Sequence, residues 1–186
     1  LVVVIGRPVN SVGLPEISQS LAAGELGSFF WLPADTLALV AFAAMFIGFA
    51  VKVPVVPVHT WLPDAHVEAP TPVSVMLAGV LLKMGTYALL RYNYTMLPTQ
   101  AEYFAVPIAI IAVVSVIYGA MLALAQEDLK RIVAYSSVSS MGYVLLGLVA
   151  FTEFGLGGAT FQMVAHGLIS GLMFMAVGVI YNATHT

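Results

Sequence analysis

Five long apolar runs dominate this chain of 186 residues. They cover approximately residues 36–58, 72–92, 104–125, 132–151 and 158–181. A bilayer hydrocarbon core about 30 Å thick needs around 20 mostly apolar residues per helix, and each run meets that length. Solid apolar runs also differ from the short alternating segments of a membrane-spanning barrel. The sequence therefore predicts an all-α, polytopic transmembrane helix bundle.

Composition excludes the main alternatives to a membrane protein. The chain is 61% apolar and 8% charged, whereas a soluble domain is about 45–50% apolar and about 25% charged. Disorder is excluded because it requires low hydrophobicity. A net charge of −3 with no basic stripe argues against a nucleic-acid partner. The sequence has no cysteine, which removes disulfides, thiol catalysis and Cys-ligated zinc.

The first 35 residues differ from the rest of the chain. Residues 1–5 are apolar and are expected to be the end of a preceding helix, and residues 6–35 an extramembrane loop with many Gly and Pro residues. Neither has the features of a signal peptide. We expect a fragment of a longer polytopic protein. Basic residues are balanced between the two sides, and the pair Lys130 and Arg131 favours a cytoplasmic position for the connector 127–131.

Lys83 is the most informative polar residue, because it lies near the centre of the second apolar run. A lysine at this depth costs about 2.5–3.5 kcal/mol on insertion scales. To reach water by extending its side chain, the ammonium would have to climb about 15 Å, which exceeds the length of the stem. Lys83 is therefore expected to face the bundle interior, a partner or water. Such a lysine either has a functional role or serves only to hold helices together.

Lys52 lies late in the first run, beside Pro54 and Pro57. The two prolines remove backbone donors, and their rings clash with the carbonyls four residues earlier, at Ala50 and Val53. This pattern predicts a broken helix near residues 52–57. Freed carbonyls at membrane depth occur only against protein or a water-filled cavity, and transporters build ion sites from such breaks. The alternative is a lysine that extends from a helix end to the interface.

His166 shares one helical face with Gln162 and Ser170, at intervals of four residues. A histidine can both donate and accept a proton near neutral pH, as a relay requires. Hydrogen bonding between helices explains the pattern equally well. A second stripe of small and hydroxyl residues indicates close helix packing, and comprises Ser136, Ser140, Tyr143 and Gly147.

The connector 59–70 carries four potential metal ligands, namely His59, Asp64, His66 and Glu68. Their spacing matches no zinc pattern, and we expect no metal site. Trp61 and the histidines favour an interfacial loop stiffened by proline. The sequence also contains no glycine-rich phosphate loop and no nucleophile constellation, so we expect no catalytic residues and no cofactor on this chain.

Three segments resemble a known family. They are FAVKVPVVPVHTWLPDAHVEAPTPVS at 49–74, LAGVLLKMGTYALLR at 77–91 and DLKRIVAYSSVS at 128–139. Across residues 36–186 the chain resembles the antiporter-like, proton-conducting membrane subunits of respiratory complex I, especially the M type. The resemblance implies a fold of about fourteen helices in two inverted repeats, each with a broken helix.

The resemblance also implies roles for individual residues. Lys52 matches the gated input lysine of the broken helix, Lys83 the central proton store, and His166 a relay on the hydrated path. The glutamate that pairs with the first lysine lies upstream of this chain, and a second broken helix lies downstream. Ser140 departs from the pattern, because many relatives carry a histidine at this position.

The function implied by the resemblance is proton translocation, driven by quinone reduction elsewhere in an NADH:quinone oxidoreductase. Expected partners are other membrane subunits of complex I, the lipid bilayer, protons and internal water, in a bacterial inner membrane. A subunit of a multisubunit sodium/proton antiporter, a subunit of a membrane-bound hydrogenase and a non-conducting scaffold remain alternatives. The sequence leaves the electron donor and the quinone open.

Overall fold

The computed structural model describes residues 13, 16–17, 19–20 and 33–184. From residue 33 onward these residues form a series of helices with no strand, so the predicted all-α fold is confirmed. The expected helix end at residues 1–5 and most of the loop at 6–35 lie outside the described residues. The elements are α3 (Ala34–Lys52), α4 (Trp61–Glu68), α5 (Thr71–Met76), the π-helix η1 (Leu77–Leu81), α6 (Leu82–Ala88), the π-helix η2 (Leu89–Tyr94), α7 (Pro98–Tyr103), α8 (Ala105–Leu124), α9 (Leu129–Val149) and α10 (Glu153–Thr184).

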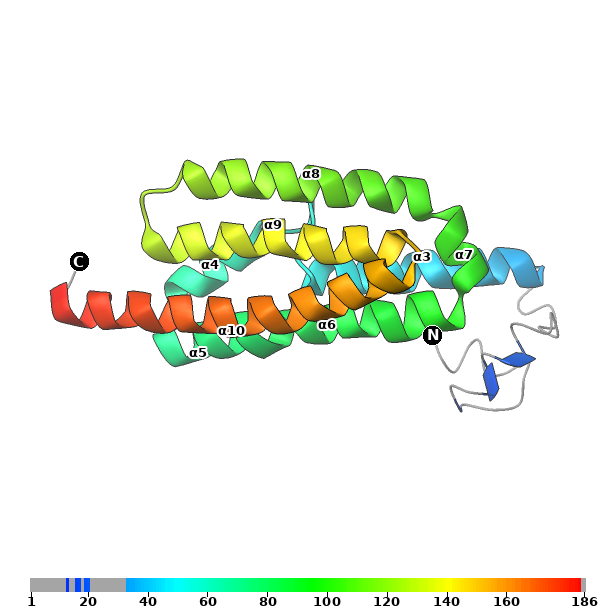
Figure 1. Cartoon of the computed structure of the whole chain (residues 1–186), viewed down its shortest axis with the longest axis horizontal. Coiled ribbons are helices and arrows are strands. Elements are labelled where there is room, and N and C mark those ends of the chain that lie inside the picture. Colours follow the sequence, from blue (N-terminus) through cyan, green and yellow to red (C-terminus); the bar gives the residue numbers. More distant parts are fainter. Residues whose placement is uncertain (1–12, 14–15, 18, 21–32, 185–186) are drawn as a thin grey trace.

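Five helical segments are long and apolar enough to cross a membrane. They are Asp35–Lys52, Thr71–Tyr94, Ala105–Leu124, Leu129–Val149 and Glu153–Tyr181. Figure 1 shows α8, α9 and α10 running along the same long axis, with α5 and α6 beside α10. The chain is a multi-pass membrane protein whose second span joins α5, η1, α6 and η2.

The first residue of α9 differs from the sequence expectation, because a side chain caps the start of this helix. α9 begins at Leu129 instead of residue 132, because the Asp128 carboxylate accepts hydrogen bonds from the amides of Lys130 (2.7 Å) and Arg131 (3.3 Å). Such a cap satisfies amides that have no partner within the helix. The two π-helical turns in the second span were not predicted, since no pattern of apolar residues distinguishes them from an α-helix.

The expectation of an interfacial loop at residues 59–70 is wrong, because eight of these residues form α4. Pro63 is the third residue of this helix, where a missing amide costs little because the first turn has no internal partner for it. α4 packs against α9, and its His66 side chain is completely buried. One side of this connector, with Leu62, Pro63 and His66, is therefore packed into the interior.

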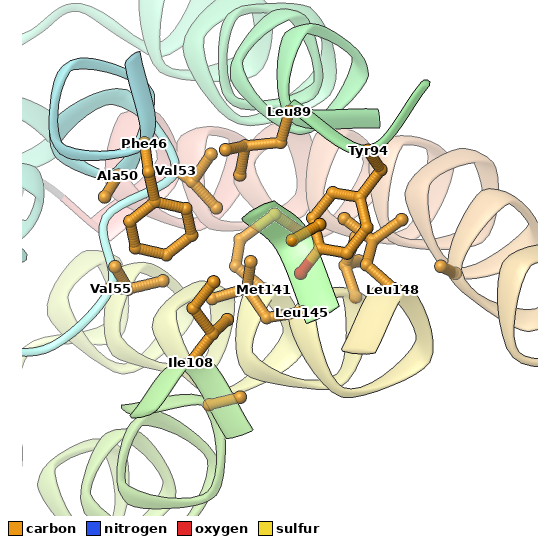
Figure 2. Close-up of a cluster of buried hydrophobic side chains, with 14 of the residues drawn as sticks. Phe46, Ala50, Val53, Val55, Leu89, Tyr94, Ile108, Met141, Leu145 and Leu148 are labelled. Atoms are coloured by element: carbon orange, nitrogen blue, oxygen red, sulfur yellow. The ribbon is translucent and has the colours of Figure 1, made fainter. Parts of the chain in front are cut away.

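The main hydrophobic core surrounds the end of α3. Figure 2 shows Val53 and Val55 pointing into the same cluster as Ile108 of α8 and Met141 of α9. α8 and α9 approach closely at a glycine: a Cβ on Gly142 would lie 2.8 Å from the Ala112 carbonyl oxygen. Small residues thus let helix backbones meet, as is common in membrane bundles.

The second stripe contributes to this packing at one of its ends. A Cβ on Gly147 would lie 2.7 Å from the Gly155 carbonyl oxygen, which brings α9 and α10 together near their short connector. Ser136 donates a hydrogen bond to the Val133 carbonyl oxygen of its own helix at 2.7 Å, and Tyr143 is exposed. Within this stripe, close helix packing is thus seen at Gly147, whereas Ser136 bonds within its own helix and Tyr143 faces outward.

Candidate functional site

The side chains of Lys83 and His166 meet between the second and fifth spans. The Lys83 Nζ lies 2.5 Å from the His166 Nδ1. The ammonium also donates a hydrogen bond to the Ala78 carbonyl oxygen, which belongs to the π-helical turn η1. A lysine in the middle of a span is thereby satisfied by one imidazole and one backbone carbonyl.

Two glycines allow this contact. A Cβ on Gly167, the residue after His166, would lie 3.0 Å from the Gly79 carbonyl oxygen and 3.6 Å from the Lys83 Cε. The backbones of η1 and α10 can therefore approach without intervening side chains. This close approach carries His166 within hydrogen-bonding distance of Lys83.

The chemistry of the two groups determines the tautomer of His166. An ammonium can only donate hydrogen bonds, so a contact with charged Lys83 requires the His166 Nδ1 to accept. A neutral imidazole then carries its proton on Nε2. That nitrogen is buried and has no hydrogen-bond partner within the described part of the chain. One ammonium proton of Lys83 therefore points at the His166 Nδ1, and the proton on the His166 Nε2 is donated to no described residue.

The polar face that carries His166 lies on the inner side of α10. His166 and Ser170 are both buried, and Gln162 is half-buried. The Ser170 hydroxyl donates to the His166 carbonyl oxygen at 2.5 Å, within the same helix. Within this stripe, and among the residues that the structure describes, only His166 makes a polar contact with a side chain of another span.

Lys83 also borders a groove of about 810 Å³ between the second span and α10. The groove is lined mainly by apolar side chains, among them Met84, Met163 and Leu172. Within a low-dielectric setting such as this, an electrostatic contact is stronger than in water. The Lys83–His166 contact is therefore set in surroundings that offer few competing hydrogen bonds.

Lys52 is the last residue of α3, and residues 53–60 continue without a regular helix. Pro54 is buried, Pro57 is exposed, and the peptide bond between Val56 and Pro57 is cis. The interruption lies near the middle of the long axis of the bundle, between α3 and α4 (Figure 1). It forms where the two prolines remove backbone donors.

Two side chains hold the interrupted backbone. The Trp61 indole Nε1 donates to the Val51 carbonyl oxygen at 2.9 Å, and the Val56 amide donates to the Ser115 Oγ at 3.0 Å. Ser115 was missed by the sequence analysis. The available signal was that Ser115 is the only Ser or Thr in residues 105–124, a run that is otherwise almost wholly apolar.

Lys52 and Lys83 lie on elements that touch each other. A Cβ on Gly85 of α6 would lie 3.3 Å from the Lys52 Cβ and 2.9 Å from the Val53 Cγ2. The Lys52 side chain is exposed and makes no hydrogen bond or ion pair with the described residues. The structure therefore brings Lys83 and His166 together, and places Lys52 beside the helix that carries Lys83.

The four potential metal ligands of the connector have separate environments. His59 meets the edge of Tyr118, His66 stacks on Phe174 with ring centroids 4.2 Å apart, and Asp64 pairs with Arg131 at 3.2 Å. Among the residues described, no three His, Asp or Glu side chains are grouped to hold a metal ion. Burial, and secondarily the Lys130 ammonium, lower the pKa of His66 to about 4.

These features define a class of protein. Transporters build ion pathways from interrupted helices and from ionisable residues between spans. Glycine-mediated contacts let the helices around such a pathway pack closely. A family model described as "NADH:quinone oxidoreductase/Mrp antiporter, TM" matches residues 7–186, and the chain belongs to this family.

Curated relatives are about half identical to the chain. It is 54% identical over 150 residues to the NAD(P)H-quinone oxidoreductase chain 4 of a Synechococcus strain, covering 81% of this chain and 28% of the relative. It is 51% identical over 142 residues to the NADH-quinone oxidoreductase subunit M of Rickettsia typhi, covering 76% of this chain and 29% of the relative. The chain thus spans less than a third of the length of these relatives.

Solved structures share the fold. A chain of respiratory complex I from Thermus thermophilus with bound NADH matches with a TM-score of 0.85 and 28% identity, covering 100% of this chain and 38% of that chain. An archaeal membrane-bound sulfane sulfur reductase matches with a TM-score of 0.82 and 27% identity, over 97% of this chain and 35% of that chain. A chain of the Mrp complex from a Dietzia species is similar in fold, with a TM-score of 0.79 and 24% identity, over 96% and 31% of the two chains.

Proposed function

We propose that this chain is part of a proton-translocating membrane subunit of an NADH, or related donor, quinone oxidoreductase. Relatives about half identical to it are named as subunits of such enzymes. The observation that carries the proposal is the contact of 2.5 Å between Lys83 and His166, because it joins two proton-carrying groups from different spans. The chain would act as part of a translocase and hold no redox centre of its own.

The Lys83–His166 pair can pass one proton along its length. Lys83 gives a proton from its ammonium to the His166 Nδ1, which forms an imidazolium and a neutral amine. The imidazolium then releases the other proton from Nε2, and the imidazole is left neutral in its second tautomer. Both ring nitrogens take part, which is the property that suits histidine to a relay. Internal water would accept the released proton.

Lys52 supplies the entry step in this proposal. It lies at the interruption of the first span, where freed carbonyls can face water or protein. Its side chain is exposed, and α3 contacts the helix that carries Lys83, so internal water would connect the two ammonium groups. Pro54 and Pro57 have the role of maintaining the interruption.

The complete protein would form a larger fold than this chain. We propose about fourteen helices in two inverted repeats, of which residues 36–186 supply five spans that follow an extramembrane segment. Its partners would be other membrane subunits of the complex and the lipid of a bacterial inner membrane. Coupling to quinone reduction would occur through those subunits.

A sodium/proton antiporter is the second candidate, because the family includes Mrp antiporters. The two functions differ in the transported ion. Transport that depends on sodium, and that persists without an electron donor, would favour the antiporter. Transport that requires donor and quinone, and that proceeds without sodium, would favour the oxidoreductase.

The test of the first function is Lys83→Ala in the complete complex, reconstituted into liposomes. We expect at least about a tenfold loss of proton uptake, because a positioned proton-transfer group is removed. Electron transfer from donor to quinone should fall with it or run uncoupled. Leu81→Ala, which changes an exposed neighbour outside the lining of the groove, serves as the control. If Lys83→Ala pumps at the parental rate in assembled complex, the proposed path is wrong and a scaffold role for Lys83 replaces it.

A further inference from the structure

We propose that Ser115 is a positioning residue for Lys52, acting through the hydrogen bond that its hydroxyl accepts from the Val56 amide. The bond joins α8 to the interrupted segment across 59 residues of sequence at 3.0 Å. This inference rests on the proposed function, because it assigns Ser115 to the entry lysine of the same path. Ser115 touches neither lysine, so its effect is indirect.

The interruption leaves the Val56 amide without its helical partner. In a continuous helix this amide would donate to the carbonyl of Lys52, four residues earlier. The helix instead ends at Lys52, and a half-buried amide without a partner is unfavourable. The Ser115 side chain is completely buried and donates its own proton to the Ile111 carbonyl oxygen at 2.7 Å. Its oxygen is therefore oriented to accept from Val56.

The rest of the segment has little room to compensate. Val53 and Val55 are buried in the core cluster of Figure 2, and on the other side Val53 abuts Gly85 of α6. Apolar contacts restrict the segment without directing its polar groups. Among the described residues, the Ser115 bond is the hydrogen bond between this segment and α8, and the His59 ring also meets Tyr118 of α8. The Ser115 bond therefore fixes the backbone at Val56, near Lys52, relative to that helix.

Ser137 of α9 provides a matched control. It is also completely buried, and its hydroxyl likewise donates to the carbonyl four residues earlier, that of Val133, at 3.0 Å. Unlike Ser115, it accepts no hydrogen bond from another element among the residues described. A comparison of Ser115→Ala with Ser137→Ala therefore isolates the bond from the Val56 amide.

The experiment measures two quantities on the assembled complex. Ser115→Ala is expected to lower the number of protons taken up per electron pair by roughly twofold or more, and to speed amide exchange in residues 53–60 by roughly tenfold, because one half-buried amide loses its partner. Ser115→Thr, which keeps the hydroxyl, should restore both values. Ser137→Ala should leave both at the parental level. Ser115→Cys replaces Ser115→Ala if the alanine variant does not assemble.

The outcomes separate this inference from the proposed function. Unchanged amide exchange in Ser115→Ala, or equal effects of Ser115→Ala and Ser137→Ala on proton uptake, would overturn the positioning role. If Lys83→Ala still abolishes uptake in that case, the proposed function stands without Ser115. If Lys83→Ala and Lys52→Ala both pump normally, the path itself is wrong and the positioning role is overturned with it.

Discussion

Lys83 and His166 are in direct contact, although 83 positions separate them in the sequence. Their 2.5 Å separation leaves no space for a water molecule between Nζ and Nδ1. Proton transfer between them needs no intervening carrier, whereas the routes towards and away from the pair do. The pair is therefore the part of the proposed path that side-chain substitution can test most directly.

Replacement of His166 by Phe should interrupt proton uptake while preserving the volume of the ring. The expected loss is roughly tenfold or more, because Lys83 is left without its acceptor on α10. Uptake into liposomes and the amount of assembled complex should be measured together. Ser170→Ala is the control, since the Ser170 hydroxyl bonds only within α10 among the described contacts. Normal uptake in His166→Phe would show that protons bypass this residue.

Gly85→Ala should disturb the contact between the two lysine-bearing elements. The new methyl group would meet the Val53 Cγ2 at 2.9 Å and the Lys52 Cβ at 3.3 Å, so these side chains or one of the two elements must shift. Overpacking of this kind typically costs about 1–3 kcal/mol. We expect a lower thermal stability and reduced proton uptake.

Gly48→Ala on α3 is the matched control for this change. A Cβ on Gly48 meets nothing within 4 Å, so the same substitution adds no contact there. It should raise helix stability slightly or leave it unchanged. Equal behaviour of the two variants would show that the segment after Lys52 accommodates the extra methyl group without cost.

His66 should make the stability of the complex depend on pH. Its pKa in the folded chain is about 4, against an ordinary value of 6.5. Because the folded pKa is lower, the stabilising contribution is complete above pH 6.5 and is lost as the pH falls towards 4, with a limit of about 3 kcal/mol. His66→Phe should retain the stack on Phe174 and flatten this dependence. Thermal inactivation of both forms between pH 7.5 and 5 provides the measurement, and parallel profiles would contradict the expectation.

Asp128→Ala should destabilise the start of α9. The carboxylate caps the amides of Lys130 and Arg131, and loss of such a cap costs about 1 kcal/mol. Asp128→Asn should retain most of the stability, because an amide oxygen can also accept. Glu127→Ala, which alters the adjacent exposed carboxylate, is the control for charge. Chemical or thermal unfolding of the detergent-solubilised complex would measure the difference.

Much of the fold was predictable because the bilayer constrains it so strongly. Apolar runs of about 20 residues have few alternatives to spanning helices. The end of α3 near Pro54 followed from the missing amides. α4 was missed because a short polar stretch with prolines resembles a loop, and its helix depends on packing against α9.

The sequence predicted the residues of the candidate site, but not the contacts between them. The cost of a buried charge singled out Lys83, and the helical period placed His166 on one face. Their contact depends on the close approach of Gly79 and Gly167, which no local pattern reveals. Ser115 was overlooked because a single hydroxyl in a membrane helix can satisfy itself within that helix. Only the position of the Val56 amide shows its second role.

The direct contact of Gly85 with Lys52 and Val53 has a mechanical consequence. At this point the side chains of Lys52 and Val53 pack against Gly85 of α6, which has no side chain of its own. Repulsion between atoms already in contact rises steeply, so a shift of α3 towards α6 would press these side chains against the backbone of α6. A displacement of the entry residue would thereby reach the helix that carries Lys83.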